Sequence, residues 1–273
     1  MKLLSPAKIN LFLKIFNKRS DGYHNLATLM QTVSFFDSVE VDFAPKDEFF
    51  CSHENLKMDQ NNLCIKALNL FRHETKLLDP VKIYLEKNIP MGAGLGGGSS
   101  NAATVLFSLS KLFNVEINLI ELGSKLGSDV PFFFTSGFAF AFGRGANLIP
   151  LKQMNQQTCY LYFPCIHIPT PKVFSLFKTK DHHQTEWDLL KGYFNGDLET
   201  FNDLEPLALK YENELVKHHD RLLSCGFKRV LMTGSGSTFV IYDDIKPDLI
   251  KDLNLKKVDF IERQDNSWYQ NLI

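Results

Sequence analysis

Cysteine is scarce in this chain of 273 residues, and its five cysteines follow no pattern. They stand at positions 51, 64, 159, 165 and 225, which is an odd set without a Cys-x-x-Cys pair. Disulfide frameworks use even sets, and structural zinc sites use closely spaced pairs. The sequence therefore indicates neither of these, and we expect reduced thiols in a cytoplasmic protein.

Long apolar segments and blocks of one charge are also absent. The uncharged run 130–143 is too short to span a bilayer and contains Pro131 and Gly137. Pro6 and Lys8 interrupt any signal-like apolar region near the N-terminus. The net charge is −1, and it is spread along the chain without a basic block. Neither nucleic acid nor a membrane is expected as a partner.

Glycine, in contrast, is concentrated in one segment. Residues 90–103 read Pro-Met-Gly-Ala-Gly-Leu-Gly-Gly-Gly-Ser-Ser-Asn-Ala-Ala, so five glycines and two serines run directly into a helix-forming stretch. Glycine allows successive amides to turn toward an anion, and no Cβ blocks the approach of phosphate oxygens. The start of the following helix adds unpaired amides and a partial positive charge. The segment predicts a loop that binds a polyphosphate.

Three other interpretations of this glycine segment fail. A Walker A loop needs a lysine before its Ser or Thr, whereas Ser99 follows Gly98 directly. Residues 92–97 do fit the dinucleotide pattern, and Glu116 stands near the distance expected of a ribose-binding acid. Residues 117–126, however, have the spacing of a second helix and not of the strand that a βαβ unit needs. A flexible linker would contain no Leu95 and would not lead into an amphipathic helix.

Periodicity predicts mixed helices and strands in both halves of the chain. In residues 8–16 apolar and polar positions alternate, so Lys8 and Asn10 share one face of a strand. We expect further strands at 26–36, 39–43, 81–85, 138–142, 158–163, 229–232 and 238–242, with helices after a cap at Asn61 or Asn62 and at 101–113, 117–126 and 204–223. Because residues 148–157 turn polar, we predict an α+β protein with two domains, 1–150 and 151–273.

A phosphate loop without a lysine needs a cation and a base from elsewhere in the chain. Phosphoryl transfer depends on a cation near the transferred group, a metal on the phosphates and a carboxylate that receives the acceptor's proton. Lys8 and Asp129 are the candidates. Asp129 precedes a strongly apolar stretch, where a carboxylate is costly to bury unless it is paired. Spacing alone leaves open whether the two side chains meet or are ordinary structural charges.

Six motifs together resemble a known family. They are Ser-Pro-Ala-Lys-Ile-Asn-Leu at 5–11, Asp-Gly-Tyr-His at 21–24, the glycine loop, Gly-Ser-Asp-Val-Pro-Phe-Phe at 127–133, Ile-Pro-Thr-Pro at 168–171 and Gly-Ser-Gly at 234–236. In order and spacing they resemble the GHMP kinases, and among these the branch that acts on 4-diphosphocytidyl-2-C-methyl-D-erythritol. The resemblance implies a GHMP-kinase fold with ATP and substrate in the cleft between an N-terminal ATP-binding domain and a C-terminal domain.

The resemblance also implies a reaction and roles for individual residues. ATP would phosphorylate the 2-hydroxyl of the methylerythritol unit, in the non-mevalonate route to isoprenoid precursors. Asp129 would be the base and Lys8 its partner. The implied substrate residues are Asn10, Tyr23, His24, Thr170, Phe174 and Gly234, with the cytosine between Tyr23 and Phe174 and its polar edge at His24.

The implied ATP site combines the glycine loop with an adenine pocket. Its residues are Asn62 and Leu63 beside the adenine, and Pro90, Gly92, Gly94, Leu95, Gly96, Gly97, Gly98, Ser99 and Ser100 around the phosphates. Mg²⁺ would be bound through the ATP phosphates near Ser99 or Ser100. We expect no protein-only metal site, because the histidine pairs at 182–183 and 218–219 lack supporting ligand spacing.

Two rival functions remain at this point. Another small-molecule kinase, for example of homoserine or mevalonate, would share the glycine loop but not the Asp-Gly-Tyr-His motif. A catalytically silent nucleotide-binding module would be indicated by Ala or Asn at position 129, where this chain has Asp.

Overall fold

A long antiparallel hairpin organises the first half of the protein. In the computed structural model, which describes residues 1–54, 56–152, 157–178, 184–197, 200–264 and 267–269, strands β1 (Lys2–Lys18) and β2 (His24–Phe43) pair from Lys2 opposite Glu40 to Lys18 opposite His24. The predicted strands 26–36 and 39–43 are thus one strand. β1 is buried on both faces over most of its length, because one face meets helices and the other meets the second half of the chain.

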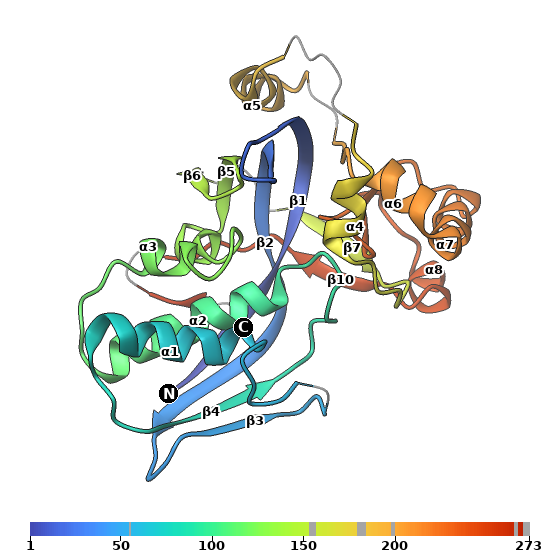
Figure 1. Cartoon of the computed structure of the whole chain (residues 1–273). Helices are drawn as coiled ribbons and strands as arrows, with labels where there is room; N and C mark the ends of the chain where they lie inside the picture. Colours follow the sequence, from blue (N-terminus) through green and yellow to red (C-terminus); the bar gives the residue numbers. More distant parts are fainter. Residues whose placement is uncertain (55, 153–156, 179–183, 198–199, 265–266, 270–273) are drawn as a thin grey trace.

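The hairpin is the centre of a six-stranded sheet. The order is β3-β4-β2-β5-β6, with β1 on β2, and the remaining strands are β3 (Glu48–Cys51), β4 (Val81–Glu86), β5 (Phe138–Gly143) and β6 (Asn147–Pro150). Helices α1 (Leu63–Thr75), α2 (Gly97–Leu112) and α3 (Leu119–Ser124) and a 3-10 helix at Pro131–Phe134 belong to the same half (Figure 1). The side chain of Asn62 caps α1 by accepting from the Cys64 amide at 2.9 Å, as predicted.

The second half builds a smaller sheet. Its order is β10-β7-β9-β8, formed by β7 (Thr158–Tyr162), β8 (Val230–Met232), β9 (Phe239–Ile241) and β10 (Lys256–Asp259). Helices α4 (Thr170–Ser175), α6 (Glu205–Tyr211), α7 (Asn213–Ser224) and α8 (Pro247–Asp252) gather beside this sheet, while α5 (Glu186–Asn195) lies apart from them (Figure 1). None of the helices in the described residues is long and apolar enough to cross a membrane.

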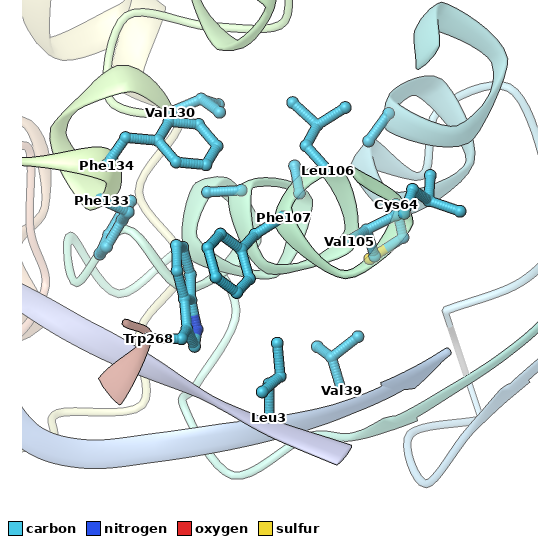
Figure 2. Close-up of a cluster of buried hydrophobic side chains, with 14 of the residues drawn as sticks. Leu3, Val39, Cys64, Val105, Leu106, Phe107, Val130, Phe133, Phe134 and Trp268 are labelled. Carbon is cyan, nitrogen blue, oxygen red and sulfur yellow. The ribbon is translucent and has the colours of Figure 1, made fainter. Parts of the chain in front are cut away.

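Of the apolar clusters formed by the described residues, two hold the layers around the hairpin together. The first lies between the large sheet and its helices, and Figure 2 shows residues of α2 such as Phe107 beside Leu3 of β1 and Trp268 of the C-terminal tail. The second joins the hairpin to the small sheet, where Ile9 and Val33 belong to one cluster with Val240. Burying such side chains is the main stabilising contribution in any fold. The hairpin therefore fixes how the two halves of the chain meet.

Some sequence expectations are wrong or incomplete. The helix expected over 204–223 is two helices, because Glu212 has extended backbone at φ −128° and ψ 101°. Helix α2 begins at Gly97, four residues before the expected start, so Ser99 and Ser100 lie in its first turn. The strands β3, β6 and β10 and the helices α4, α5 and α8 were not expected.

The C-terminal tail returns to the first half of the chain. Ile261, Trp268 and Tyr269 are buried in the first apolar cluster, and the Trp268 ring nitrogen donates to the Leu4 carbonyl at 2.7 Å. Part of the polar stretch at 148–157, namely 153–156, lies outside the described residues. A division into domains 1–150 and 151–273 stays a prediction.

Candidate active site

The glycine loop lies against the part of β1 that carries Lys8. It follows β4, and three of its glycines have positive φ, with Gly94 at 78° and Gly96 at 67°. A Cβ on Gly94 would lie 2.2 Å from the Thr233 carbonyl oxygen, and one on Gly96 would lie 2.9 Å from Lys8 Cγ. Both positions therefore need glycine for conformation and for space. The Lys8 amide donates to the Leu95 carbonyl at 2.9 Å, which ties the loop to the strand beneath it.

Helix α2 starts directly at this loop. Gly96 is its N-cap residue, and no side chain caps the first amides. Uncapped amides and the helix dipole together favour an anion at this place. Gly97, Gly98 and Ser99 line the cavity in front of the helix. The first turn of α2 therefore has the chemistry that phosphate oxygens need.

Lys8 and Asp129 meet, a contact that spacing alone left open and that the family resemblance implied. Lys8 Nζ lies 3.6 Å from Asp129 Oδ2 and donates to Asn10 Oδ1 at 2.8 Å. The Lys8 side chain is 5% exposed, whereas that of Asp129 is 40% exposed. The ammonium is thus held in place by two oxygens, and the carboxylate remains accessible from the cavity.

Asn10 links the pair to a second glycine loop at residues 233–237. Its amide nitrogen Nδ2 donates to Thr28 Oγ1 at 2.7 Å, and its backbone amide donates to Thr233 Oγ1 at 3.0 Å. Gly234, in this second loop, has φ 58°, and a Cβ there would approach Lys8 Nζ to 3.5 Å. The two glycine loops therefore pack against each other around Lys8.

The second glycine loop is fixed from behind by residues that the sequence analysis missed. Asn202 Nδ2 donates to the carbonyls of Met232 and Gly234, each at 2.7 Å. The Glu205 carboxylate accepts from the Met232 amide at 2.7 Å, and burial raises the pKa of Glu205 above its usual value. The sequence around Asn202 does not indicate this contact, because the carbonyls that it binds lie 30 and 32 residues further along the chain.

Aromatic side chains form the other end of the site. His24 stacks on Phe174 with ring centroids 5.7 Å apart and lies edge-on to Phe177 at 5.6 Å. Tyr23 is 53% exposed, and the Arg144 guanidinium carbon lies 4.0 Å from its ring centroid. No ring contact joins Tyr23 and Phe174 among the described residues, although both line the same cavity. A planar base between them remains a prediction.

The protonation of His24 follows from its surroundings. Burial lowers the pKa of His24 below its usual value, and the nearby Lys18 ammonium lowers it further. A neutral imidazole is therefore favoured near pH 7, and it offers one N–H donor and one nitrogen acceptor. Such a ring can hydrogen-bond to the polar edge of a pyrimidine.

One cavity of about 950 Å³ collects nearly all predicted site residues. Its wall comes from both halves of the chain, with Lys8 and the glycine loop on one side and Thr170 and Gly234 on the other. Thr170 Oγ1 lies 2.6 Å from Ser235 Oγ, which joins α4 to the second glycine loop. The predicted residues in the wall are Lys8, Asn10, Tyr23, His24, Leu63, Pro90, Gly92, Gly94, Leu95, Gly96, Gly97, Gly98, Ser99, Asp129, Thr170, Phe174 and Gly234.

Two predicted ATP residues lie outside that wall. Asn62 is buried, and its side chain is used by the α1 cap and by a bond to the Lys57 carbonyl at 3.0 Å. Ser100 is fully buried, and its hydroxyl accepts from Ser5 Oγ at 2.8 Å. Of the two serines named for Mg²⁺, Ser99 is therefore the one that faces the cavity.

A buried ion pair supports the glycine loop from below. Lys87 Nζ lies 2.5 Å from Asp37 Oδ2, with side chains 4% and 0% exposed. Asp37 also accepts from the amides of Asn88 and Ile89 at 2.6 and 2.7 Å and from Asn101 Nδ2 at 2.8 Å. One carboxylate thus joins β2, the segment before the loop and helix α2. Its role could not be predicted from the sequence, because its partners Lys87 and Asn88 lie 50 and 51 residues away.

The histidine pairs were the candidates for metal ligation by protein groups alone. Within the described residues no cluster of three or more His, Cys, Asp or Glu could hold a metal ion. The His218 and His219 side chains contact different partners. His218 Nδ1 lies 2.6 Å from the Tyr162 hydroxyl, and His219 Nε2 lies 3.6 Å from Glu205 Oε1. The pair 182–183 lies outside the described residues.

Sequence comparisons identify relatives over the whole chain. A family model for the GHMP kinases N terminal domain matches residues 62–137. The 4-diphosphocytidyl-2-C-methyl-D-erythritol kinase of Protochlamydia amoebophila (strain UWE25) is 38% identical over 277 residues, which cover 100% of this chain and 94% of that protein. The chloroplastic kinase of the same name from Arabidopsis thaliana is 35% identical over 295 residues, covering 99% of this chain and 76% of that protein.

Solved structures give the same result at the level of the fold. A crystal structure of 4-(cytidine 5'-diphospho)-2C-methyl-D-erythritol kinase matches with a TM-score of 0.80 and 33% identity, covering 96% of this chain and 99% of that one. A mevalonate kinase matches with a TM-score of 0.64 at 15% identity, covering 97% and 100%, and therefore shares the fold alone. The chain belongs to the 4-diphosphocytidyl-2-C-methyl-D-erythritol kinases of the GHMP kinase family.

Proposed function

We propose that this protein transfers the γ-phosphoryl group of ATP to the 2-hydroxyl of 4-diphosphocytidyl-2-C-methyl-D-erythritol, in the non-mevalonate route to isoprenoid precursors. The observation that carries the proposal is the Lys8–Asp129 pair, at 3.6 Å, in one cavity with an uncapped helix start and an aromatic end. The bacterial and plant relatives that share the full chain are named as kinases of this substrate.

In the proposed mechanism Asp129 accepts the proton of the attacking hydroxyl. Lys8 orients the carboxylate through the 3.6 Å ion pair, and its charge also stabilises the developing charge on the transferred group. Asn10 fixes the Lys8 ammonium through the 2.8 Å bond and would lie beside the acceptor hydroxyl. The pair thus places a buried ammonium beside a carboxylate that the acceptor can reach.

ATP is the donor in the GHMP kinases, and the residues present suit it. The amides at the start of α2 would bind the phosphates, with Asn62 and Leu63 beside the adenine. Mg²⁺ would be held through those phosphates near Ser99, where it would neutralise their charge. The Asn62 side chain is used by the α1 cap, and its backbone amide donates to Asp59, so Leu63 is the predicted adenine residue that faces the cavity.

We also propose a cytoplasmic protein that works on small molecules. All five cysteines are free in the structure, and burial raises the pKa of the Cys64 and Cys159 thiols to about 12. Buried thiols of this kind are typical of a reducing compartment. The partner expected is a substrate with a cytidine diphosphate group.

The function is tested by measuring ATP consumption with three acceptors. Because the aromatic end would recognise a base that mevalonate and homoserine lack, kcat/KM for the diphosphocytidyl substrate should exceed that for either rival by at least about 10²-fold. Equal or higher kcat/KM with mevalonate or homoserine would contradict the proposal.

The pyrimidine clamp gives a prediction for Tyr23→Ala. Truncation removes one stacking face, and base–aromatic stacking is worth roughly 1–3 kcal/mol, so affinity for the diphosphocytidyl substrate should fall about fivefold to 150-fold. ATP affinity should stay unchanged, because the adenine is assigned to the pocket near Leu63. Titration calorimetry with each ligand measures both.

The matched control is Tyr23→Phe, which keeps the ring and loses only the hydroxyl. It should bind the substrate nearly as well as the unaltered protein. If Tyr23→Ala weakens ATP instead of the substrate, the clamp assignment is wrong.

A further inference from the structure

Arg144 occupies an unusual place in the cavity wall. It lies in the turn between β5 and β6, and the neighbouring Gly143 pairs with Leu26 just after the Tyr23–His24 segment (Figure 1). Its guanidinium carbon is 4.0 Å from the Tyr23 ring centroid. Arginine is well suited to such stacking, because its guanidinium is planar and weakly hydrated. Within the described part of the chain the guanidinium N–H groups form no hydrogen bond or ion pair, so the stack leaves them able to turn toward a ligand.

The same turn reaches toward the catalytic pair. A Cβ on Gly145 would lie 3.9 Å from Ser128 Cβ, and Ser128 immediately precedes Asp129. Arg144 and Gly145 both line the cavity together with Tyr23 and Asp129. Arg144 therefore lies on the wall between the aromatic end and the end where the hydroxyl would react. In an acceptor whose base lies at the aromatic end and whose hydroxyl lies beside Asp129, the linking diphosphate would lie next to Arg144.

The charges around Arg144 leave it available for an anion. Lys8, Lys18 and Arg144 are the Lys and Arg residues that the described structure contributes to the cavity wall. Lys8 is engaged by Asp129 and Asn10. Asp21, on the neighbouring turn, is paired with Arg19 at 3.0 Å. The Arg144 guanidinium is near enough to Asp21 to help lower the pKa of that carboxyl, but no ion pair joins the two among the described residues, and Arg144 stacks on the Tyr23 ring instead.

We propose that Arg144 binds the diphosphate of the acceptor and determines the preference for a nucleoside diphosphate over a bare nucleoside. The inference rests on the proposed function and assigns a specificity residue to the same site. Guanidinium groups bind phosphate oxygens through paired, charge-assisted hydrogen bonds. Stacking on Tyr23 orients the guanidinium beforehand, so that less side-chain freedom is lost when the ligand binds.

The simplest alternative is that Arg144 only supports the Tyr23 ring. In that case its loss would weaken every ligand that stacks on Tyr23 to the same degree, whether or not the ligand carries phosphates. If the diphosphate is the partner, the loss must grow with the number of phosphates. The variant Arg144→Met separates the two, since it removes the charge and keeps an unbranched apolar side chain.

The experiment compares cytidine, cytidine diphosphate, the diphosphocytidyl substrate and ATP by titration calorimetry. Losing a hydrogen bond to a charged group lowers affinity strongly, so Arg144→Met should lower the affinity for both diphosphate ligands about tenfold or more. The affinity for cytidine and for ATP should fall by less than about twofold. KM for the diphosphocytidyl substrate should rise by a similar factor with little change in kcat. Arg144→Lys should recover part of the affinity, because it restores the charge without the planar fork.

The matched control is Lys18→Met, which removes another cation from the same wall without touching the stack on Tyr23. A distributed electrostatic effect is screened by salt, so this change should weaken the diphosphate ligands by no more than about threefold. An equal loss for cytidine and cytidine diphosphate in Arg144→Met, or no loss for either, overturns the inference. Failure of the proposed function is seen separately, as an unaltered protein that does not phosphorylate the diphosphocytidyl substrate.

Discussion

Asp129→Asn should bind ATP about as tightly as the unaltered protein and yet turn over at least about 10²-fold more slowly, since a positioned general base contributes 10²–10⁴. The amide has the shape of the carboxylate but cannot accept the proton of the attacking hydroxyl. It also cannot form the ion pair that joins Asp129 Oδ2 to Lys8 Nζ at 3.6 Å. The measurements are kcat with the diphosphocytidyl substrate and calorimetric titration of ATP.

Lys8→Ala provides the matched comparison, because it breaks the same pair from the other side. It should be similarly slow, and the double variant should be little slower than either single one, since residues that act as a unit are not additive in kcat. Turnover near that of the unaltered protein in Asp129→Asn would remove the base from the mechanism. Additive losses in the double variant would mean that Lys8 and Asp129 act separately.

The parts of the site that lie close together in sequence could be predicted from it. The glycine loop, its exit into α2 and the cap at Asn62 depend on neighbours within a few residues, so residue type and spacing are enough. The alternation in β1 correctly gave Lys8 and Asn10 one face, and their side chains do meet at 2.8 Å. That Asp129 joins them was inferred from a family resemblance and not from spacing.

Features that depend on distant partners could not be predicted. Asn202 holds the second glycine loop through carbonyls thirty residues away, and Trp268 bonds to a carbonyl at Leu4. The break at Glu212 between α6 and α7 also lacks a proline or glycine that would mark it. In each case a tertiary contact or a local backbone change determines the structure, and neither helical periodicity nor composition indicates it.

The aromatic end shows the same limit within one motif. Tyr23 and His24 are adjacent, and the family resemblance implied a cytosine between Tyr23 and Phe174, which stays a prediction. In the structure His24 is the ring that stacks on Phe174, while Arg144 stacks on Tyr23. Arg144 is far from the motif in sequence, so no local pattern could connect the two. The structure was needed to bring Arg144 into the site.

Asp37→Ala should have the largest effect on stability. It leaves the Lys87 ammonium, whose side chain is 4% exposed, with the Ile89 carbonyl as its remaining acceptor in the described structure. Removing one partner of a buried ion pair typically costs 3–5 kcal/mol, so the free energy of unfolding should fall by about that amount. The backbone amides of Asn88 and Ile89 also lose their acceptor. Urea denaturation followed by circular dichroism measures the change.

Asp37 and Lys87 do not contribute equally to stability, because Asp37 has more hydrogen-bond partners than Lys87 has. Lys87→Met leaves Asp37 with three other donors, from Asn88, Ile89 and Asn101, so it should destabilise the protein less than Asp37→Ala does. In the double variant Asp37→Ala, Lys87→Met no ammonium is left unpaired in the interior, so part of the loss should be recovered. If the loss in free energy of unfolding in the double variant equals the sum of the losses in the two single variants, Asp37 and Lys87 are not energetically coupled. Lys87 Nζ would lie 3.0 Å from a Cβ on Gly97, so the ion pair packs directly against the first turn of α2. ATP affinity should therefore weaken together with stability in Asp37→Ala.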